Sequence, residues 1–285
     1  MIAPPTTAGS SAAIAIIAAL LEARTAQQIG SNRVWRIEST LKPLLRAHGF
    51  ETIDALAAEM TGKPGGALTE MVVEALLNQE TSFFRDAGVI ELAIDALLVR
   101  MDEAPFVRPR IWSVGCSTGQ EALSLAMLIA ERCPESASRV DIVATDVSKR
   151  ALDRARSGRY TQFEIQRGLP IRRMLQWFDA VDEEWAAKPD LVSRIQHRRH
   201  NLANDPMPPG RFDLILCRNV LFYFSPSVRR AVLDQLAAAL RPGGLLVLGA
   251  GETVIGQTEL LVPSPRWRGF YAARPECSAA LAKTG

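Results

Sequence analysis

Two acidic residues follow short apolar runs, at positions where an open α/β sheet is expected to bind a ligand. The run Ile111–Val114 is followed by the glycine-rich loop Gly115–Gly119, and Glu121 falls in the first turn of the helical pattern that the loop opens. A second run, Val140–Ala144, leads to Asp146. In such sheets, ligands bind beyond the carboxyl ends of the strands. The pattern therefore predicts that the loop and the two carboxylates surround one ligand.

The residue types in this loop argue against a dinucleotide. A pyrophosphate site uses G-x-G-x-x-G, whose second glycine lets the phosphate approach the backbone. Here that position is Ser117, and Glu121 would repel the phosphates. Glu121 can instead accept hydrogen bonds from an ammonium group, and Asp146 is placed to bind two ribose hydroxyls. Taken singly, Glu121 could be a carboxylate favoured by the helix dipole and Asp146 a turn residue. Together they favour S-adenosylmethionine (SAM), with S-adenosylhomocysteine as its product.

Strand-like and helical patterns alternate from residue 110 onward, which is typical of a doubly wound, mostly parallel α/β sheet. Further strands are expected at Phe212–Cys217 and Leu245–Leu248, and Trp267–Ala272 alternates enough to be an edge strand. Between Tyr160 and Asn201 the alternation stops. We expect this stretch to be an insertion between the second and third strands of the sheet.

The first seventy-odd residues show helical periodicity. One buried helical face is predicted by i, i+3, i+4, i+7, i+8 spacing and consists of Leu68, Met71, Val72, Ala75 and Leu76. Four basic residues lie along a mostly helical stretch near residues 34–47, and they are Arg33, Arg36, Lys42 and Arg46. Taken alone, such charges usually form a solvated helix face. A second basic run, Arg194–Arg199, lies in the expected insertion.

Composition limits the class of protein. The chain has 285 residues, of which 48% are hydrophobic, and its formal net charge of +2 gives no global field for a nucleic acid partner. The apolar run Ala12–Leu21 is about half as long as the roughly 20 residues of a membrane span. The cysteines are scattered, and His197 and His200 lack nearby ligands, so neither a disulfide framework nor a metal site is predicted. A reducing cytoplasm is the simplest location.

Several sequence blocks resemble the CheR family of SAM-dependent chemoreceptor glutamate methyltransferases, over nearly the whole chain. These blocks are Asn78–Asp86 (NQETSFFRD), Trp112–Glu121 (WSVGCSTGQE), Ala144–Asp146 (ATD), Ala155–Tyr160 (ARSGRY), Asn201–Leu202 (NL) and Cys217–Phe224 (CRNVLFYF). The T-x-F-F-R and C-R-N-V-x-x-Y-F strings, in this order and spacing, make the resemblance specific.

The resemblance implies three parts of the chain. They are an all-α N-terminal domain at residues 1–77, a linker and first cofactor-contacting segment at 78–109, and a SAM-binding domain at 110–285. The last part is expected to be a doubly wound, Rossmann-like methyltransferase sheet, with a small β-subdomain inserted at about residues 160–200.

The resemblance also implies an activity and a partner. The activity is transfer of methyl from SAM to glutamate side chains of chemoreceptors, which gives methyl esters in sensory adaptation and needs no metal. The partner is the cytoplasmic helical region of the receptor, contacted through Arg33, Arg36, Lys42 and Arg46. The chain would then meet a membrane only through its receptor.

Carried over residue by residue, the resemblance assigns cofactor contacts to Gln79, Thr81, Arg85, Gly115, Glu121, Asp146, Asn201, Leu202, Arg218 and Asn219. It places Arg85 and Tyr223 close to the transferring methyl. Three features depart from the family pattern. Gln79 stands where Asn is usual, the common E-E-P-Y-S is here QEALS, and the stretch between Phe178 and Asn201 lacks a glycine-rich loop.

Two other functions fit part of the pattern. A SAM-dependent enzyme acting on a small molecule or RNA would explain Glu121 and Asp146, but neither the helical front module nor the T-x-F-F-R string. A non-catalytic regulator that binds SAM would have no need of an intact Arg85 and Tyr223.

Overall fold

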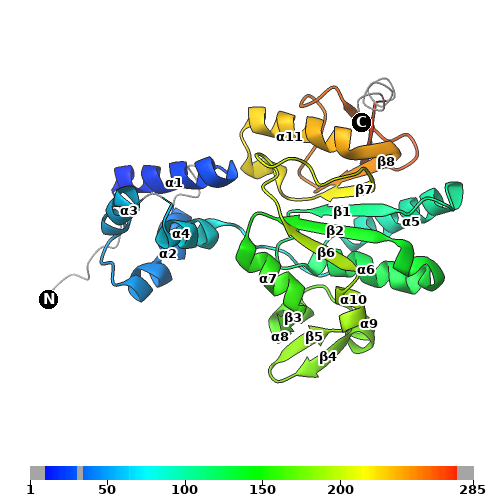
Figure 1. Cartoon of the computed structure of the whole chain (residues 1–285), viewed down its shortest axis with the longest axis horizontal. Coiled ribbons are helices and arrows are strands. Elements are labelled where there is room, and N and C mark those ends of the chain that lie inside the picture. The colour runs from blue at the N-terminus through cyan, green and yellow to red at the C-terminus, as the bar shows by residue number, and fades with distance from the viewer. Residues whose placement is uncertain (1–9, 31–34, 64, 275–285) are drawn as a thin grey trace. The chain divides into compact units, whose positions relative to one another are not determined.

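The computed structural model describes residues 10–30, 35–63 and 65–274. The chain divides into two compact units, one of Met1–Asn78 with Tyr223–Ser225 and one of Gln79–Phe222 with Pro226–Gly285. It passes between the units three times, at 78–79, 222–223 and 225–226. Figure 1 shows helices and strands of both units.

In the described part of the N-terminal unit, four helices pack around one apolar core. They are α1 (Ser11–Thr25), α2 (Trp35–His48), α3 (Ile53–Gly62) and α4 (Ala67–Leu76). The side chains of Ser10 and Thr52 cap α1 and α3 by accepting backbone N–H groups at 3.2 Å. The core contains Ile17, Ile37, Leu41, Ile53, Leu56 and Val72.

The apolar stretch Ala12–Leu21 lies within α1, which buries Ala13 and Ile17 in this core and also buries Leu21. The described residues contain no helix with both the length and the apolar character needed to cross a membrane. On α4 the predicted face is partly wrong, because Met71 is 37% exposed and Val73 is buried. The buried face of α4 therefore lies next to the one that the spacing predicted.

A seven-stranded sheet forms the centre of the second unit, in the order β6-β2-β1-β7-β8-β10-β9. Figure 1 labels its strands from β6 to β8. The strands are β1 (Arg110–Val114), β2 (Asp141–Asp146), β6 (Ile195–Arg199), β7 (Phe212–Cys217), β8 (Leu240–Leu248), β9 (Leu261–Pro263) and β10 (Phe270–Ala273). Strands β6, β2, β1, β7 and β8 pair in parallel, whereas β10 is antiparallel to both β8 and β9. The predicted α/β class is confirmed.

Helices connect these strands, as expected for crossover connections between parallel strands. The longer ones are α6 (Gln120–Arg132), α7 (Lys149–Ser157) and α11 (Pro226–Ala239), whereas α5 (Ala87–Glu103) precedes the first strand. Two short 3-10 helices, η2 (Pro134–Arg139) and η3 (Leu221–Tyr223), complete the connections. Gly158 ends α7 in the left-handed conformation, as the sequence predicts for a C-terminal glycine.

Two strands differ from expectation. The strand expected at Trp267–Ala272 forms as β10, but it is not at the edge, because β9 pairs with its outer side. The basic run Arg194–Arg199, expected to lie in the insertion, contains β6, which is the other edge of the main sheet. An edge strand tolerates charged side chains, since one side of it is unpaired. This explains why the run carried no apolar strand signal.

The insertion between β2 and β6 folds as a three-stranded antiparallel sheet in the order β3-β5-β4. Its elements are β3 (Arg159–Thr161), α8 (Gln162–Gln166), α9 (Ile171–Trp177), β4 (Phe178–Val181), β5 (Glu184–Ala187) and α10 (Pro189–Val192). The rings of Tyr160 and Phe178 pack edge-on against Phe83, with centroid distances of 5.0 and 5.5 Å. This aromatic junction joins the insertion to the segment that precedes α5.

The same junction requires a glycine at residue 168. Gly168 has a φ angle of +91°, and an added Cβ would collide with the carbonyl oxygen of Phe83. We expect Gly168→Ala to lower the free energy of unfolding by about 1–2 kcal/mol from backbone strain alone, and further through the collision. Urea unfolding measures this change.

The matched control is Gly88→Ala, in the first turn of α5, where an added Cβ meets nothing within 4 Å. This substitution should leave stability unchanged or raise it by up to about 1 kcal/mol. If Gly168→Ala were as stable as Gly88→Ala, the packing of residue 168 against Phe83 would be wrong.

Candidate functional site

The loop between β1 and α6 is fixed by left-handed backbone and by close packing. Gly115, Ser117 and Gly119 have φ angles of +64°, +51° and +94°. An added Cβ at Gly115 would lie 2.6 Å from Val220 Cγ2, so the position requires glycine. Ser117 adopts the left-handed region at a cost of about 1–2 kcal/mol for a residue with a Cβ. Its hydrogen bonds offset that cost.

Ser117 connects the loop to two of the residues predicted to bind the cofactor. Its backbone N–H donates to Oδ2 of Asp146 at 2.8 Å, and its Oγ lies 3.0 Å from both the carbonyl oxygen and Oε1 of Gln79. The other oxygen of Asp146 accepts the N–H of Ser148 at 2.9 Å. The carboxylate at the end of β2 is therefore oriented from both sides. Gln79 is tied to the loop by the Ser117 hydroxyl.

Strand β6 brings Asn201 and Leu202 to the same end of the sheet. The backbone N–H of His200, just after β6, donates to the carbonyl oxygen of Asp146 at 3.0 Å. Oδ1 of Asn201 accepts the N–H of Ala203 at 3.2 Å, which forms a tight side-chain-to-backbone turn. Leu202, within that turn, is buried. The two predicted residues thus follow directly after the backbone contact with Asp146.

A buried arginine at the end of β7 joins two carboxylates. The side chain of Arg218 is only 2% exposed, and one of its terminal nitrogens lies 3.0 Å from Oε2 of Glu121. The other terminal nitrogen forms an ion pair with Asp86 and donates to the carbonyl oxygen of Arg85 at 3.0 Å. Oε1 of Glu121 accepts the hydroxyl of Ser113 at 2.8 Å. A buried guanidinium needs such partners, because an unpaired buried charge is very costly.

The segment before α5 reaches this arginine through its backbone. The N–H of Phe84 donates to Oγ of Ser124 on α6 at 3.0 Å, which anchors the T-x-F-F-R string. Arg85 supplies the carbonyl oxygen that Arg218 binds, and its own side chain is half-buried. Thr81 lies earlier in the same string and is also half-buried.

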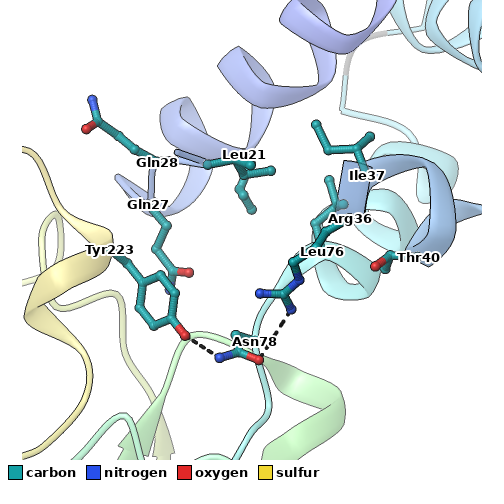
Figure 2. A pocket seen from close by; sticks show the side chains of 10 residues that line it. Leu21, Gln27, Gln28, Arg36, Ile37, Thr40, Leu76, Asn78 and Tyr223 are labelled. Atoms are coloured by element: carbon teal, nitrogen blue, oxygen red, sulfur yellow. Dashed lines mark hydrogen bonds between the residues drawn. The ribbon is translucent and has the colours of Figure 1, made fainter. Parts of the chain in front are cut away.

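Tyr223 belongs to the N-terminal unit, unlike the other residues predicted for the site. Its phenol oxygen accepts a hydrogen bond from Nδ2 of Asn78, and its backbone carbonyl accepts the N–H of Gln28 at 2.7 Å. Figure 2 shows Tyr223 and Asn78 at one side of a small pocket, with the guanidinium of Arg36 pointing toward Asn78. A terminal nitrogen of Arg36 is 3.5 Å from Oδ1 of Asn78. The helices of the N-terminal unit therefore hold the predicted catalytic tyrosine.

Sequence reasoning missed Glu252, which holds the C-R-N-V segment in place. Its Oε2 accepts the N–H groups of Asn219 and Gly249 at 2.8 Å, and its Oε1 accepts those of Val220 and Leu221 at 2.9 and 2.8 Å. Asn219, predicted to contact the cofactor, has a φ angle of +60° in this arrangement. A glycine-rich stretch after the last parallel strand, GAGE at 249–252, was the available signal.

Two cysteines border the site without being nucleophiles. Burial raises the pKa of the Cys116 thiol well above its usual value, and the charges of Asp146 and Glu121 raise it further. Burial also raises the pKa of Cys217, to which the carboxylates of Glu252 and Glu121 add. Because the thiolate is the reactive form, both side chains stay protonated and inert at neutral pH.

The donor set fits SAM better than a phosphate-bearing ligand. Glu121, in the first turn of α6, puts negative charge where a phosphate would bind. Asp146 keeps two oriented oxygens at the end of β2, as ribose hydroxyls require. The Nε–H of Arg218 is buried and has no acceptor among the described residues, so it offers a donor to a carboxylate such as that of SAM. The site therefore offers an acceptor suited to an ammonium, an acceptor suited to ribose hydroxyls and a donor suited to a carboxylate, which are the groups that SAM carries.

The four hydrogen bonds of Glu252 give a testable expectation. Glu252→Gln places an NH₂ group against backbone N–H donors and removes the charge, so buried donors lose their acceptor. Because a hydrogen bond to a charged group contributes roughly 1.5–3 kcal/mol, we expect the free energy of unfolding to fall by about 2–4 kcal/mol. Thermal or urea unfolding measures this change.

Glu259→Gln, at an exposed residue near β9, is the control and should lower the free energy of unfolding by less than about 0.5 kcal/mol. Equal stabilities of the two variants would remove Glu252 from this role.

Residues 79–266 match the family model described as CheR methyltransferase, SAM binding domain. Chemotaxis protein methyltransferase 1 of Pseudomonas aeruginosa is 38% identical over 232 residues, which cover 79% of this chain and 84% of that protein. Chemotaxis protein methyltransferase 1 of Vibrio cholerae is 36% identical over 244 residues, or 84% of this chain and 88% of that protein.

Among solved structures, the CcbJ methyltransferase from Streptomyces caelestis is similar to 56% of this chain and 51% of its own, with 18% identity and a TM-score of 0.34. The assignment rests on the sequence matches, which include every block from the T-x-F-F-R string to the C-R-N-V-x-x-Y-F string. The chain belongs to the CheR methyltransferase family.

Proposed function

We propose that this chain, a SAM-dependent chemotaxis methyltransferase, transfers the methyl group of SAM to glutamate carboxylates in the cytoplasmic helical region of chemoreceptors, and that it works in the cytoplasm. The products are glutamyl methyl esters and S-adenosylhomocysteine. The observation that carries the proposal is the arrangement of Glu121, Asp146 and Arg218 around the loop at the ends of β1, β2 and β7.

In this proposal, the ends of the parallel strands bind SAM. Glu121 accepts the ammonium, Asp146 accepts the ribose hydroxyls, and Arg218 donates to the carboxylate. The remaining contacts come from the loop and the neighbouring segments, and they involve Gln79, Thr81, Arg85, Gly115, Asn201, Leu202 and Asn219. The bound SAM supplies an electrophilic methyl group on a sulfonium.

The acceptor needs little acid–base help. A glutamate with an ordinary pKa of about 4.3 is already ionised at neutral pH, so no general base is required. The task of the protein is to hold a carboxylate oxygen in line with the methyl, which is catalysis by proximity and orientation. We assign Arg85 to hold the other carboxylate oxygen and Tyr223 to orient groups beside the methyl. The Asn78 hydrogen bond supports the latter role by fixing the phenol oxygen.

The receptor-contacting surface is proposed to lie on α2. Lys42 and Arg46 are exposed and one turn apart, on the side away from the buried Leu41 and Leu45. Arg36 is half-buried and directed toward Asn78, so it is the least suited of the set to bind a partner alone. Arg33 lies outside the described residues. Charge at exposed positions acts mainly on the rate of encounter with an acidic partner.

The activity is tested with labelled SAM and a receptor cytoplasmic fragment, with and without its candidate glutamates. We expect base-labile label only on the fragment that retains the glutamates.

Arg85→Ala should lower kcat at least tenfold with little change in melting temperature, because the acceptor loses its orienting cation. Arg132→Ala, at a half-exposed ion pair on the far part of α6, is the control and should retain kcat.

The other functions give different results in the same assay. Equal labelling of a fragment without the glutamates would point to another substrate class. Tight binding of S-adenosylhomocysteine without any methyl transfer would identify a regulator instead of an enzyme. Either result would overturn the proposal.

The receptor surface is tested by reversing two charges, in the double variant Lys42→Glu, Arg46→Glu. We expect a higher KM for receptor at low salt, a flatter dependence of kcat/KM on salt, and unchanged affinity for S-adenosylhomocysteine. Salt screens such charges over about 10 Å at 0.1 M, so the difference from the wild type should shrink as salt rises. Arg230→Glu on α11, also exposed, is the control. A KM equal to that of the wild type at low salt would leave these residues as a solvated helix face.

A further inference from the structure

One contact of the insertion reaches the loop at 115–119 directly, and it comes from Tyr160 on β3. The side chain of Tyr160 is fully buried, and its hydroxyl donates a hydrogen bond to the carbonyl oxygen of Thr118 at 2.8 Å. Thr118 lies in the loop between Ser117 and Gly119. The hydroxyl of the Thr118 side chain makes a different hydrogen bond, donating from Oγ1 to Oε1 of Gln120 at 2.8 Å. The phenol therefore fixes the loop through its backbone.

The loop is shaped to receive this phenol. Gly119 has a φ angle of +94°, and an added Cβ would lie 2.9 Å from Cβ of Ala155 and 3.2 Å from the Tyr160 hydroxyl oxygen. Glycine at this position lets the backbone close against α7 and against the tyrosine. Burial of the Tyr160 side chain raises the pKa of its phenol well above the usual value, so the hydroxyl stays protonated and remains a hydrogen-bond donor at neutral pH.

The same ring also contacts the segment that carries Arg85. Tyr160 and Phe83 pack edge-on at 5.0 Å, and Phe178 of β4 packs edge-on against Phe83. Phe83 belongs to the T-x-F-F-R string, two residues before Arg85. One side chain of the inserted sheet thus touches both segments proposed to bind SAM, the first through a hydrogen bond and the second through ring packing.

We propose that Tyr160 is a positioning residue for the SAM site, through which the inserted sheet holds the loop at 115–119 in its binding conformation. The proposal deepens the proposed function and rests on the loop binding SAM. Because coupling between two sites is reciprocal, a ligand bound at the loop should in turn make the inserted sheet more rigid.

The substitution Tyr160→Phe removes one hydroxyl and leaves the ring in place. In the ligand-free protein, we expect amide hydrogen exchange at Ser117–Glu121 to become at least tenfold faster. This region includes the N–H of Gly119, which donates to the carbonyl of Cys116 at 3.0 Å. By isothermal titration calorimetry, the Kd for S-adenosylhomocysteine should rise about tenfold. For the wild type, S-adenosylhomocysteine should slow exchange at β3 and β5.

Trp177→Phe is the matched control, because it also removes one hydrogen bond between the insertion and α6. The indole Nε1 of Trp177 donates to Oε1 of Glu131 at 3.1 Å, far along α6 from the loop. This variant should keep wild-type exchange at the loop and wild-type Kd. Melting temperatures of both variants show whether a change in Kd merely follows a loss of stability.

The outcomes are separable. Wild-type exchange and Kd in Tyr160→Phe would overturn the positioning role, and so would equal losses in Tyr160→Phe and Trp177→Phe. The exchange measurement uses no ligand, so it reports on Tyr160 even if the wild type proves to methylate another substrate. Faster loop exchange with an unchanged Kd would show that the loop is held by Tyr160 but does not bind S-adenosylhomocysteine, which would overturn the inference for the SAM site.

Discussion

A guanidinium that is almost completely removed from water must be surrounded by acceptors, and the site is organised around that requirement. Arg218 has a 2% exposed side chain and draws together Glu121 from α6, Asp86 from the N-terminus of α5 and the carbonyl of Arg85. Removing Glu121, the more buried of the two carboxylates, would leave the guanidinium charge balanced only by the half-exposed Asp86, and breaking such a buried pair typically costs about 3–5 kcal/mol. Three segments distant in sequence are therefore fixed at one point, and each of them carries a residue proposed to bind SAM.

The remaining parts of the site are held by backbone hydrogen bonds rather than by further ion pairs. Asp146 accepts N–H groups on both sides, and Glu252 accepts four, so the turns after β1, β2 and β7 are closed by carboxylates. Such turns have positive φ angles at Ser117 and Asn219, where a side chain is strained. The strain persists because the surrounding hydrogen bonds determine the conformation, as is common at functional sites.

Much of the fold and site could be predicted, because the relevant signals are local. Apolar runs predict buried parallel strands, and a glycine loop followed by an acidic residue predicts the loop and Glu121. The features that the sequence did not predict depend on contacts between residues far apart in the chain. β6 is an edge strand whose basic residues hide the pattern, and β10 lies inside the sheet because β9 pairs with it, which no local signal reveals. Glu252 acts on residues 31–33 positions before it, so its role depends on tertiary pairing.

The assignment of Tyr223–Ser225 to the N-terminal unit has an evolutionary consequence. A unit whose residues are contiguous can be gained, lost or exchanged between genes as a single cassette. Here the helical unit includes three residues supplied by the methyltransferase half of the chain, and Tyr223 depends on Asn78 and Gln28 for its hydrogen bonds. A recombination event that brought in different front helices would separate this tyrosine from its partners. The two halves are therefore expected to be inherited together, with substitutions at Asn78, whose side chain binds the phenol, tracking those at Tyr223.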